Sequence, residues 1–400
     1  MSSSGKPIDR NVMREVNQNT LLNLVRLHAP VSRAQLVALS GLSVGTVVGI
    51  ISELLKRQII IEQGIADSVL GRKAGLLELH PEGGYVVGLS LVEENTVAAV
   101  LLNLAGEIVC SDSWRAELRN QGEHVVEMLA MGVESFLSTH SVLRSKILGL
   151  GCGLPGYVNA QTGYSIDNWI HNWHHLAISQ PLAQQVQFPV YIDNIMNCLG
   201  SYEKLFGRGK HYQHFLVVTL GRGIGMAIIV NGELYRGAHN GGGELGHIPC
   251  VPDGRLCECG NRGCLEAYVA DHGLLATYRE VSCLSGANST LSEHLTLSEV
   301  HVLAKGGNGS VLHIFEQAGR FLGTGLATMV NIFNPECIIL TGVDMESHQL
   351  MFAAMQTAFR SSTFSSLGEN LPVMIEPVLD TRWAQGAGCL VLRHFFGSPL

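Results

Sequence analysis

Three cysteines at short spacings form the densest group of metal-binding side chains in this 400-residue sequence. They are Cys257, Cys259 and Cys264, and Gly260 and Gly263 allow the chain between them to curl around a centre. Thiolates are preferred zinc ligands, and a closed structural zinc site takes four ligands in a tetrahedron. The segment therefore predicts one structural Zn²⁺ per chain, with one ligand still to be supplied.

Two nearby residues are candidates for the fourth ligand. His247 is the first candidate, because an imidazole nitrogen completes a tetrahedral site with three cysteines. Cys250 is the second, although Pro249 and Pro252 frame it and it lacks a paired spacing. The alternative to a metal site is a set of free structural thiols. The other six cysteines stand singly among apolar residues, as small buried side chains do.

The composition indicates a globular protein of the reducing cytoplasm. Hydrophobic residues make up 46% of the chain and charged residues 15%, and 46 glycines indicate many tight turns. The first residues contain no apolar signal-peptide segment, and no uninterrupted apolar run of about 18 residues follows. We therefore expect a cytoplasmic protein with no membrane partner, in which clustered cysteines bind metal.

The N-terminal region is predicted to be a winged helix-turn-helix. Apolar residues at helical spacing begin near Val16, and Ser32 can cap a short second helix that Gly41 ends. Ser43 can cap a third helix, which continues to about Arg57. Two short helices joined by a glycine-containing turn are typical of DNA-binding domains. The alternative is a small helical dimerisation domain.

Two strand-like segments, 59–64 and 75–81, flank residues that we interpret as the wing. Hydroxyl and basic side chains at these places suit phosphates and base edges. The expected DNA-binding residues are Ser43, Thr46, Arg72 and Lys73.

The charge distribution confines DNA binding to this first domain. Residues 1–83 carry a formal net charge of +2, whereas the remainder carries −10. An acidic body does not bind phosphates, so contacts should come from residues 1–83 alone. Because the third helix has no basic residue before Lys56, each subunit should bind DNA weakly. Dimeric binding is therefore expected.

After Gly84 the pattern changes to strands alternating with helices. Three short strands separated by turns open this region at 85–109, and a similar opening recurs near Phe215. This recurrence indicates two related α/β lobes facing each other across a cleft. We expect the first lobe at 84–192, completed by residues 381–400, and the second at 193–380.

Several motifs together resemble the ROK family of repressors, open reading frames and kinases. They are the helix-turn-helix, G-E-x-G-H at 243–247, C-x-C-G-x-x-G-C-x-E at 257–266 and the glycine turn at 221–225. The resemblance runs over nearly the whole chain. It implies an actin-like pair of lobes related to sugar kinases. Such proteins either phosphorylate a hexose with ATP or, with a winged helix, act as sugar-responsive transcription factors.

The resemblance also implies a sugar pocket. Asn194, Glu244 and Glu266 match family residues that bind sugar hydroxyls. His247 matches the residue that ligates zinc through one ring nitrogen and reaches the sugar with the other. Fixed carboxylates and an amide suit a ligand with many hydroxyl donors. Each glutamate taken alone has an equally good explanation that involves no sugar. Glu244 can be a solvated residue of a glycine loop, and Glu266 can be a carboxylate that the helix dipole favours at a helix start.

Two departures from the family kinases argue against catalysis. The kinases carry an Asp that takes the proton from the sugar hydroxyl, whereas this sequence has Ile195 there, and Asp193 nearby is expected to point elsewhere. General-base catalysis contributes roughly 10²–10⁴-fold. The kinases also carry a glycine-containing phosphate loop, which here is replaced by residues 90–96, without glycine and with Glu93 and Glu94.

We therefore predict an α/β protein with an N-terminal winged helix-turn-helix and a two-lobed actin-like body that embeds a zinc site. The expected function is a sugar-responsive repressor of carbohydrate-utilisation genes, without enzyme activity. Expected partners are operator DNA, a sugar effector and further copies of the chain in a homodimer or homotetramer. A protein partner as effector is one alternative, and an ATP-dependent hexose kinase is another.

Overall fold

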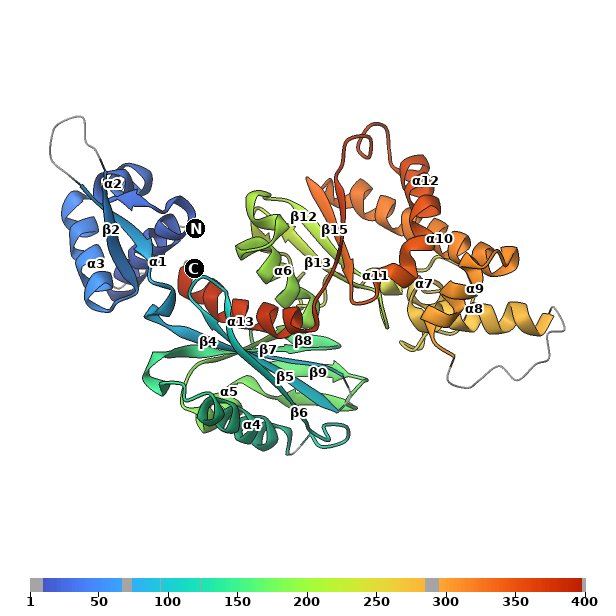
Figure 1. The fold of residues 1–400 in the computed structure, drawn as a ribbon, viewed down its shortest axis with the longest axis horizontal. Helices are drawn as coiled ribbons and strands as arrows, with labels where there is room; N and C mark the ends of the chain where they lie inside the picture. The colour runs from blue at the N-terminus through green and yellow to red at the C-terminus, as the bar shows by residue number, and fades with distance from the viewer. Residues whose placement is uncertain (1–9, 67–73, 94, 123, 285–294, 398–400) are drawn as a thin grey trace, which may run out of the picture. The chain divides into compact units, whose positions relative to one another are not determined.

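The computed structural model describes residues 10–66, 74–93, 95–122, 124–284 and 295–397 (Figure 1). The chain divides into two compact units: unit 1 contains residues 1–201 and 383–400, and unit 2 contains residues 202–382. The chain first passes from unit 1 to unit 2 inside helix α6 (Ile195–Leu205), whereas we expected the second lobe to begin at residue 193. The predicted DNA-binding residues 1–83 belong to unit 1 with the first lobe.

The N-terminal part of unit 1 combines three helices with a three-stranded antiparallel sheet. Its elements are α1 (Arg10–His28), β1 (Val31–Ser32), α2 (Arg33–Ser40), α3 (Val44–Lys56), β2 (Ile60–Ala66) and β3 (Ala74–Leu79). Ser32 caps α2 in a capping box with Gln35, and Gly41, at φ 67°, ends it. Ser43 caps α3. The predicted caps are confirmed, whereas Arg72 and Lys73 lie outside the described residues.

The body of unit 1 is built on a five-stranded sheet with the order β11-β7-β4-β5-β6. The strands are β4 (Tyr85–Glu93), β5 (Thr96–Asn103), β6 (Ile108–Arg115), β7 (Ile147–Leu154) and β11 (Val190–Asn194). The first three are antiparallel, and β7 and β11 are added in parallel. Helices α4 (Val125–Thr139) and α5 (Ser179–Val186) pack on one face, and α13 (Asp380–Phe396) lies on the other (Figure 1). Between β7 and α5 the chain forms a small sheet of three strands, β8 (Tyr157–Asn159), β9 (Tyr164–Asn168) and β10 (Trp173–Ala177).

Helix α13 approaches the sheet backbone closely because glycines face it. A Cβ atom on Gly88 would lie 2.0 Å from the carbonyl oxygen of Ala384, and one on Gly151 would lie 1.8 Å from that of Ala387. Atoms cannot approach so closely, so any other residue at these positions would push the helix away. The glycines of β4 and β7 therefore fix where α13 binds.

The end of α13 also holds the first helix of the chain. Asn19 Nδ2 donates a hydrogen bond of 2.6 Å to the carbonyl oxygen of Gly397, and the Arg26 guanidinium lies 5.6 Å from the centre of the Phe396 ring. These contacts join α1 to the C-terminal helix of unit 1.

Unit 2 repeats the strand order of unit 1. Its sheet has the order β14-β13-β12-β15-β16, with three antiparallel strands followed by two parallel additions. The strands are β12 (Phe215–Thr219), β13 (Gly225–Val230), β14 (Glu233–Leu234), β15 (Cys337–Gly342) and β16 (Val373–Pro377). The recurrence predicted near Phe215 is thus confirmed.

Helices between β14 and β15, and between β15 and β16, form the core of unit 2 with its sheet. They are α7 (Glu266–Val269), α8 (Asp271–Leu284), α9 (Leu297–Lys305), α10 (Gly309–Phe333), α11 (Met345–His348) and α12 (Phe352–Ser362). Within the described residues, no helix has the length and apolar character needed to cross a membrane.

Candidate functional site

The four residues predicted to bind metal lie together in unit 2. One ligand atom from each of His247, Cys257, Cys259 and Cys264 lies within 4.8 Å of the others. Cys257 Sγ is 3.7 Å from His247 Nδ1, and Cys259 Sγ is 3.7 Å from Cys264 Sγ. In a tetrahedral site with Zn–S bonds of about 2.3 Å, two sulfurs lie about 3.8 Å apart. The donor set and its spacing therefore fit a zinc ion.

Cys250, the rival fourth ligand, lies outside this cluster. It packs against the hydrophobic core of unit 2, and burial raises the pKa of its thiol to about 11. Its sulfur is not among the four ligand atoms that lie within 4.8 Å of one another. The geometry therefore favours His247 as the fourth member.

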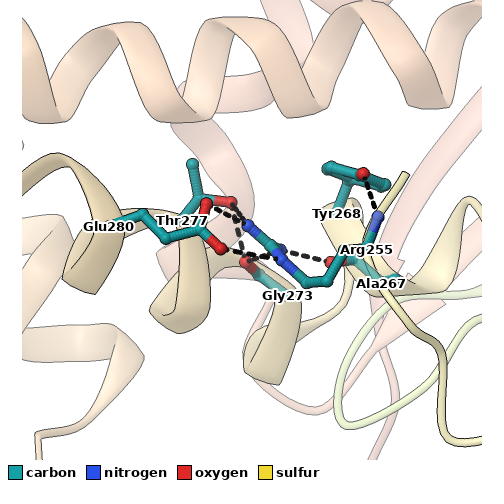
Figure 2. Close-up of polar contacts among 6 residues, drawn as sticks. All are labelled: Arg255, Ala267, Tyr268, Gly273, Thr277 and Glu280. Carbon is teal, nitrogen blue, oxygen red and sulfur yellow. Dashed lines mark hydrogen bonds and ion pairs between the residues drawn. The ribbon is translucent and has the colours of Figure 1, made fainter. Parts of the chain in front are cut away.

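Arg255 joins the cysteine loop to the helices that follow it, as Figure 2 shows. Its guanidinium donates hydrogen bonds to the carbonyl oxygens of Ala267 and Gly273, to Thr277 Oγ1 at 3.0 Å, and to the Glu280 carboxylate at 2.8 Å. These partners lie on or beside α7 and α8, so the side chain fixes the loop against both helices.

A second contact of Arg255 runs through Tyr268. The backbone N–H of Arg255 donates to the Tyr268 hydroxyl at 2.7 Å, and the guanidinium lies 4.8 Å from the centre of that ring. The sequence prediction missed Arg255, because its partners lie 12 to 25 residues further along the chain. Its spacing from the cysteines gives no signal of this role.

His247 places its two ring nitrogens on different partners. Nδ1 faces Cys257 Sγ, whereas Nε2 lies 4.0 Å from Glu244 Oε2. Loss of water around the Glu244 carboxyl raises its pKa; His247 opposes this shift and Glu266 adds to it. The arrangement leaves a carboxylate and an imidazole side by side next to the metal cluster.

Glu266 is buried at the start of α7, with 6% of its surface exposed. Its Oε2 accepts a hydrogen bond of 2.8 Å from the backbone N–H of Ile224, in the glycine turn between β12 and β13. A Cβ atom on Gly223 would lie 2.8 Å from the same oxygen. The glycine turn therefore has a packing role that involves no phosphate.

Asn194 belongs to unit 1, at the end of β11. Its Nδ2 donates to the carbonyl oxygen of Gly156 at 2.7 Å, and its Oδ1 accepts from the backbone N–H of Met196 at 2.8 Å. An amide offers two donors and two acceptor positions, so one of each remains for a ligand. Its role in binding sugar stays a prediction.

Asp193 and Ile195, on either side of Asn194, both face the interior of unit 1. Asp193 is fully buried, and its Oδ1 accepts from the backbone N–H of Asn194 and from Asn197 Nδ2, each at 2.8 Å. Ile195 packs against the small cluster of Cys198, Ala387 and Leu390. Ile195 cannot act as a base, and the Asp193 carboxylate is held by its neighbours.

The described residues predicted to contact DNA cluster at the start of α3. The Ser43 side chain accepts from the backbone N–H of Thr46, and the two hydroxyls lie 2.9 Å apart. Both residues are therefore used in capping the helix. Glu94 and the side chain of Glu93, in the segment that stands in place of the kinase phosphate loop, lie outside the described residues.

A separate cavity of about 550 Å³ lies elsewhere in unit 2. It is lined by the end of α6, residues 206–212 and strands β15 and β16, and by none of the residues predicted to bind sugar. Arg208 and Glu376 in its wall form an ion pair of 2.6 Å.

A family model described as "ROK family" matches residues 94–394. The chain is similar over 97% of its length to the xylose repressor of Bacillus subtilis (strain 168), with 28% identity over 387 residues and 97% of that protein covered. It is also similar to the DNA-binding transcriptional dual regulator NagC of Escherichia coli (strain K12), with 24% identity over 98% of this chain and 95% of that one.

Among solved structures, a ROK family transcriptional regulator, homologous to the E. coli MLC protein, superposes with a TM-score of 0.85. The match covers 96% of this chain and 98% of the other, at 24% identity. A ROK family glucokinase from Streptomyces griseus, bound to glucose and AMPPNP, superposes with a TM-score of 0.64 at 24% identity. That match covers 77% of this chain and 99% of the kinase, and both matches show the fold.

Proposed function

The chain belongs to the ROK family, and on this premise we propose that it is a sugar-responsive transcriptional repressor of carbohydrate-utilisation genes. One observation carries the proposal: a helix-turn-helix arrangement, α2 and α3, precedes a family body whose base position holds Ile195. The similarity to repressors runs through this N-terminal region, whereas the kinase match covers 77% of the chain.

We propose that residues 1–83 bind operator DNA as a homodimer or homotetramer. In helix-turn-helix proteins the second helix enters the major groove, which here is α3. Ser43, Thr46, Arg72 and Lys73 are the proposed contacts. An operator with two half-sites is bound by two copies of the domain. Two copies are also needed for affinity, because α3 has no basic residue before Lys56 to contact phosphates.

We propose that Glu244, His247 and Glu266 bind the sugar in unit 2, with Asn194 as a fourth ligand-binding residue. The buried Glu266 and the more exposed Glu244 accept hydrogen bonds from sugar hydroxyls. One Zn²⁺ per chain, held by His247, Cys257, Cys259 and Cys264, would fix the imidazole ring and the loop. His247 Nε2 would then not bind the metal and would face the Glu244 carboxylate.

The alternative function is an ATP-dependent hexose kinase, and the environment of Ile195 disfavours it. The side chain is packed among apolar neighbours, so no proton acceptor lies at that position. Purified protein incubated with ATP and each sugar that it binds should form no sugar phosphate. Turnover at the rate of a family kinase would contradict the proposal.

A two-part binding experiment tests the repressor function. The full chain should bind a DNA fragment selected from a random pool, and residues 84–400 alone should not. Xylose, glucose, N-acetylglucosamine and their 6-phosphates (the xylose 5-phosphate) should then be screened by thermal shift on both proteins. A ligand at 100 times its Kd stabilises the folded state by about 2.7 kcal/mol. The sugar that stabilises residues 84–400 should also change DNA binding by the full chain, because effector and DNA are linked through one protein.

A further inference from the structure

The outward surface of α3 is apolar from Val44 to Ser52 and carries no charge over that stretch. Val47, Ile50, Ile51 and Leu54 are buried, whereas the exposed residues are Val44, Gly45, Val48, Gly49 and Ser52, followed in the last turn by Lys56. Val44 is 64% exposed and Val48 45% exposed, although valine is usually buried. Lys56 is the first basic residue on this helix.

The hydroxyl groups near these valines are already used within the helix. Ser52 Oγ donates to the carbonyl oxygen of Val48 at 2.8 Å, and the Thr46 hydroxyl lies 2.9 Å from that of Ser43. Direct hydrogen-bond readout of bases normally uses Arg, Lys, Asn or Gln, none of which occurs between Val44 and Leu55. The exposed face therefore offers methyl groups.

From this surface we infer that α3 recognises thymines through their 5-methyl groups, with Val44 and Val48 as the residues that determine specificity. The inference rests on the proposed DNA-binding function. The 5-methyl group of thymine is the apolar feature of the major groove, and it distinguishes a T·A pair from the other pairs. A valine side chain has no complementary contact with a guanine or cytosine edge.

The geometry of the helix sets the spacing of the thymines. Val44 and Val48 lie one turn apart, about 6 Å along the helix axis. This separation corresponds to about two base-pair steps of about 3.4 Å each. We therefore expect each half-site to contain two recognised thymines about two steps apart.

Gly45 and Gly49 allow the helix backbone to approach the bases. A Cβ atom on Gly49 would meet nothing within 4 Å, and one on Gly45 would meet only Ser43 Oγ at 3.9 Å. The protein thus has room for a side chain at both positions. Glycine is less favourable than alanine inside a helix, so a partner that needs the space accounts for its presence.

Uracil substitution in DNA tests the inference, because uracil differs from thymine only by the missing methyl group. The full chain selects a duplex from a random pool, and each thymine of that duplex is then replaced singly by deoxyuridine. Fluorescence anisotropy at fixed salt measures Kd. Affinity should fall about fourfold at each recognised thymine, the value for one buried methyl group, and remain unchanged at other thymines.

Protein variants assign the effect to the two valines. Val44→Ala and Val48→Ala should each remove the preference for thymine over uracil at one position, while the salt dependence of Kd stays the same because no phosphate contact is lost. Ser52→Ala is the matched control on the same face and should keep both preferences. Gly49→Ala should bind DNA at least about tenfold more weakly while its melting temperature is equal or higher.

Three results have distinct meanings. If the full chain enriches no sequence, the proposed function is wrong and the inference falls with it. If a duplex is enriched but every uracil substitution changes Kd less than twofold, the inference alone is wrong. If Val44→Ala and Val48→Ala instead change the oligomeric state in sedimentation, with unchanged thymine preference, the apolar face is a protein interface and the inference is also wrong.

Discussion

Unit 1 and unit 2 contain five-stranded sheets with the same strand order, yet they have been elaborated differently. In both sheets three antiparallel strands are followed by two parallel ones. Between the third and fourth strands unit 1 carries residues 116–146 with α4, whereas unit 2 carries residues 235–336 with the cysteine loop and α7 to α10. The proposed ligand groups of unit 2 thus lie on an addition to a common framework.

The two sheets also differ in the turn that follows their first strand in the sequence. The turn between β4 and β5 contains no glycine, whereas the turn between β12 and β13 contains Gly221 and Gly223. In unit 2 the turn is held by Glu266 and by a hydrogen bond of 2.9 Å from the Asp271 backbone N–H to the Gly221 carbonyl oxygen. The close approach of Glu266 to Gly223 therefore explains a glycine in this turn without reference to a phosphate.

Cys257→Ser should produce the largest difference between the two units. Structural zinc contributes about 10–16 kcal/mol of binding free energy in zinc-finger peptides, and loss of one thiolate ligand removes most of it. Metal content, measured by mass spectrometry, should fall from one zinc per chain to nearly none, and sugar affinity should fall about a hundredfold. DNA binding by unit 1 without sugar should change little.

Cys250→Ser is the control for this change and should keep the metal. If it loses zinc while His247→Ala retains it, then Cys250 is the fourth ligand. The proposed link from the metal through His247 to the sugar would then be wrong.

Arg255→Ala should destabilise unit 2 by about 3 kcal/mol, because a charged hydrogen-bond donor with several partly buried partners is removed at once. Denaturant unfolding should show a lower midpoint for the transition of unit 2 and an unchanged one for unit 1. Arg262→Ala is the matched control in the same loop, since this exposed side chain makes one bond of 3.2 Å to Gly254. The unfolding free energy of unit 2 should change there by less than about 0.5 kcal/mol. Equal effects of the two variants would mean that Arg255 does not stabilise the loop against α7 and α8.

Gly223→Ala should weaken sugar binding about tenfold, an effect of about 1.4 kcal/mol. The added methyl group would lie 2.8 Å from Glu266 Oε2 and would displace that carboxylate. Gly221→Ala offers a control two residues away, because its Cβ would meet nothing within 4 Å. Calorimetric titration with the sugar found by screening should show a loss for Gly223→Ala alone. Equal affinities for both variants would mean that Glu266 does not need the close approach of the turn.

The smallest effect should be a shallow pH dependence of the stability of unit 2. His348 is fully buried, and although burial opposes its charged form, the hydrogen bond and charge of Asp271, 2.9 Å away, raise its pKa above the usual value of 6.5. The charged pair stabilises the fold below about pH 6.5, and this contribution is lost as the pH rises through the higher pKa of the folded state. His348→Gln should flatten the decline in unfolding free energy between neutral and alkaline pH. An unchanged slope would mean that another group is responsible.

Features set by neighbouring residues could be predicted from the sequence. Ser32, Gly41 and Ser43 act within one helical turn, so their capping roles followed from residue type alone. The cysteine cluster followed from spacing, because its ligands lie in one loop.

Features that depend on distant packing could not be predicted in this way. The bonds of Arg255, the bond from Ile224 to Glu266 and the contact of Asn19 with Gly397 join residues 12 to 378 positions apart. The boundary between the two units inside α6 could not be predicted either, because a helix pattern does not show where one compact unit ends. Tertiary structure alone brings these partners together.

The position of α13 has a consequence for synthesis in the cell. Gly88 and Gly151 are translated before unit 2, and the helix that covers them is translated after it. At about 5–20 residues per second, residues 202–382 take roughly 10 to 40 s to make. Throughout that interval one face of the first sheet is uncovered on the ribosome, and α1 lacks its partner at Gly397. A ribosome that stalls within unit 2 therefore leaves a nascent chain whose first-made half is open to chaperones and proteases.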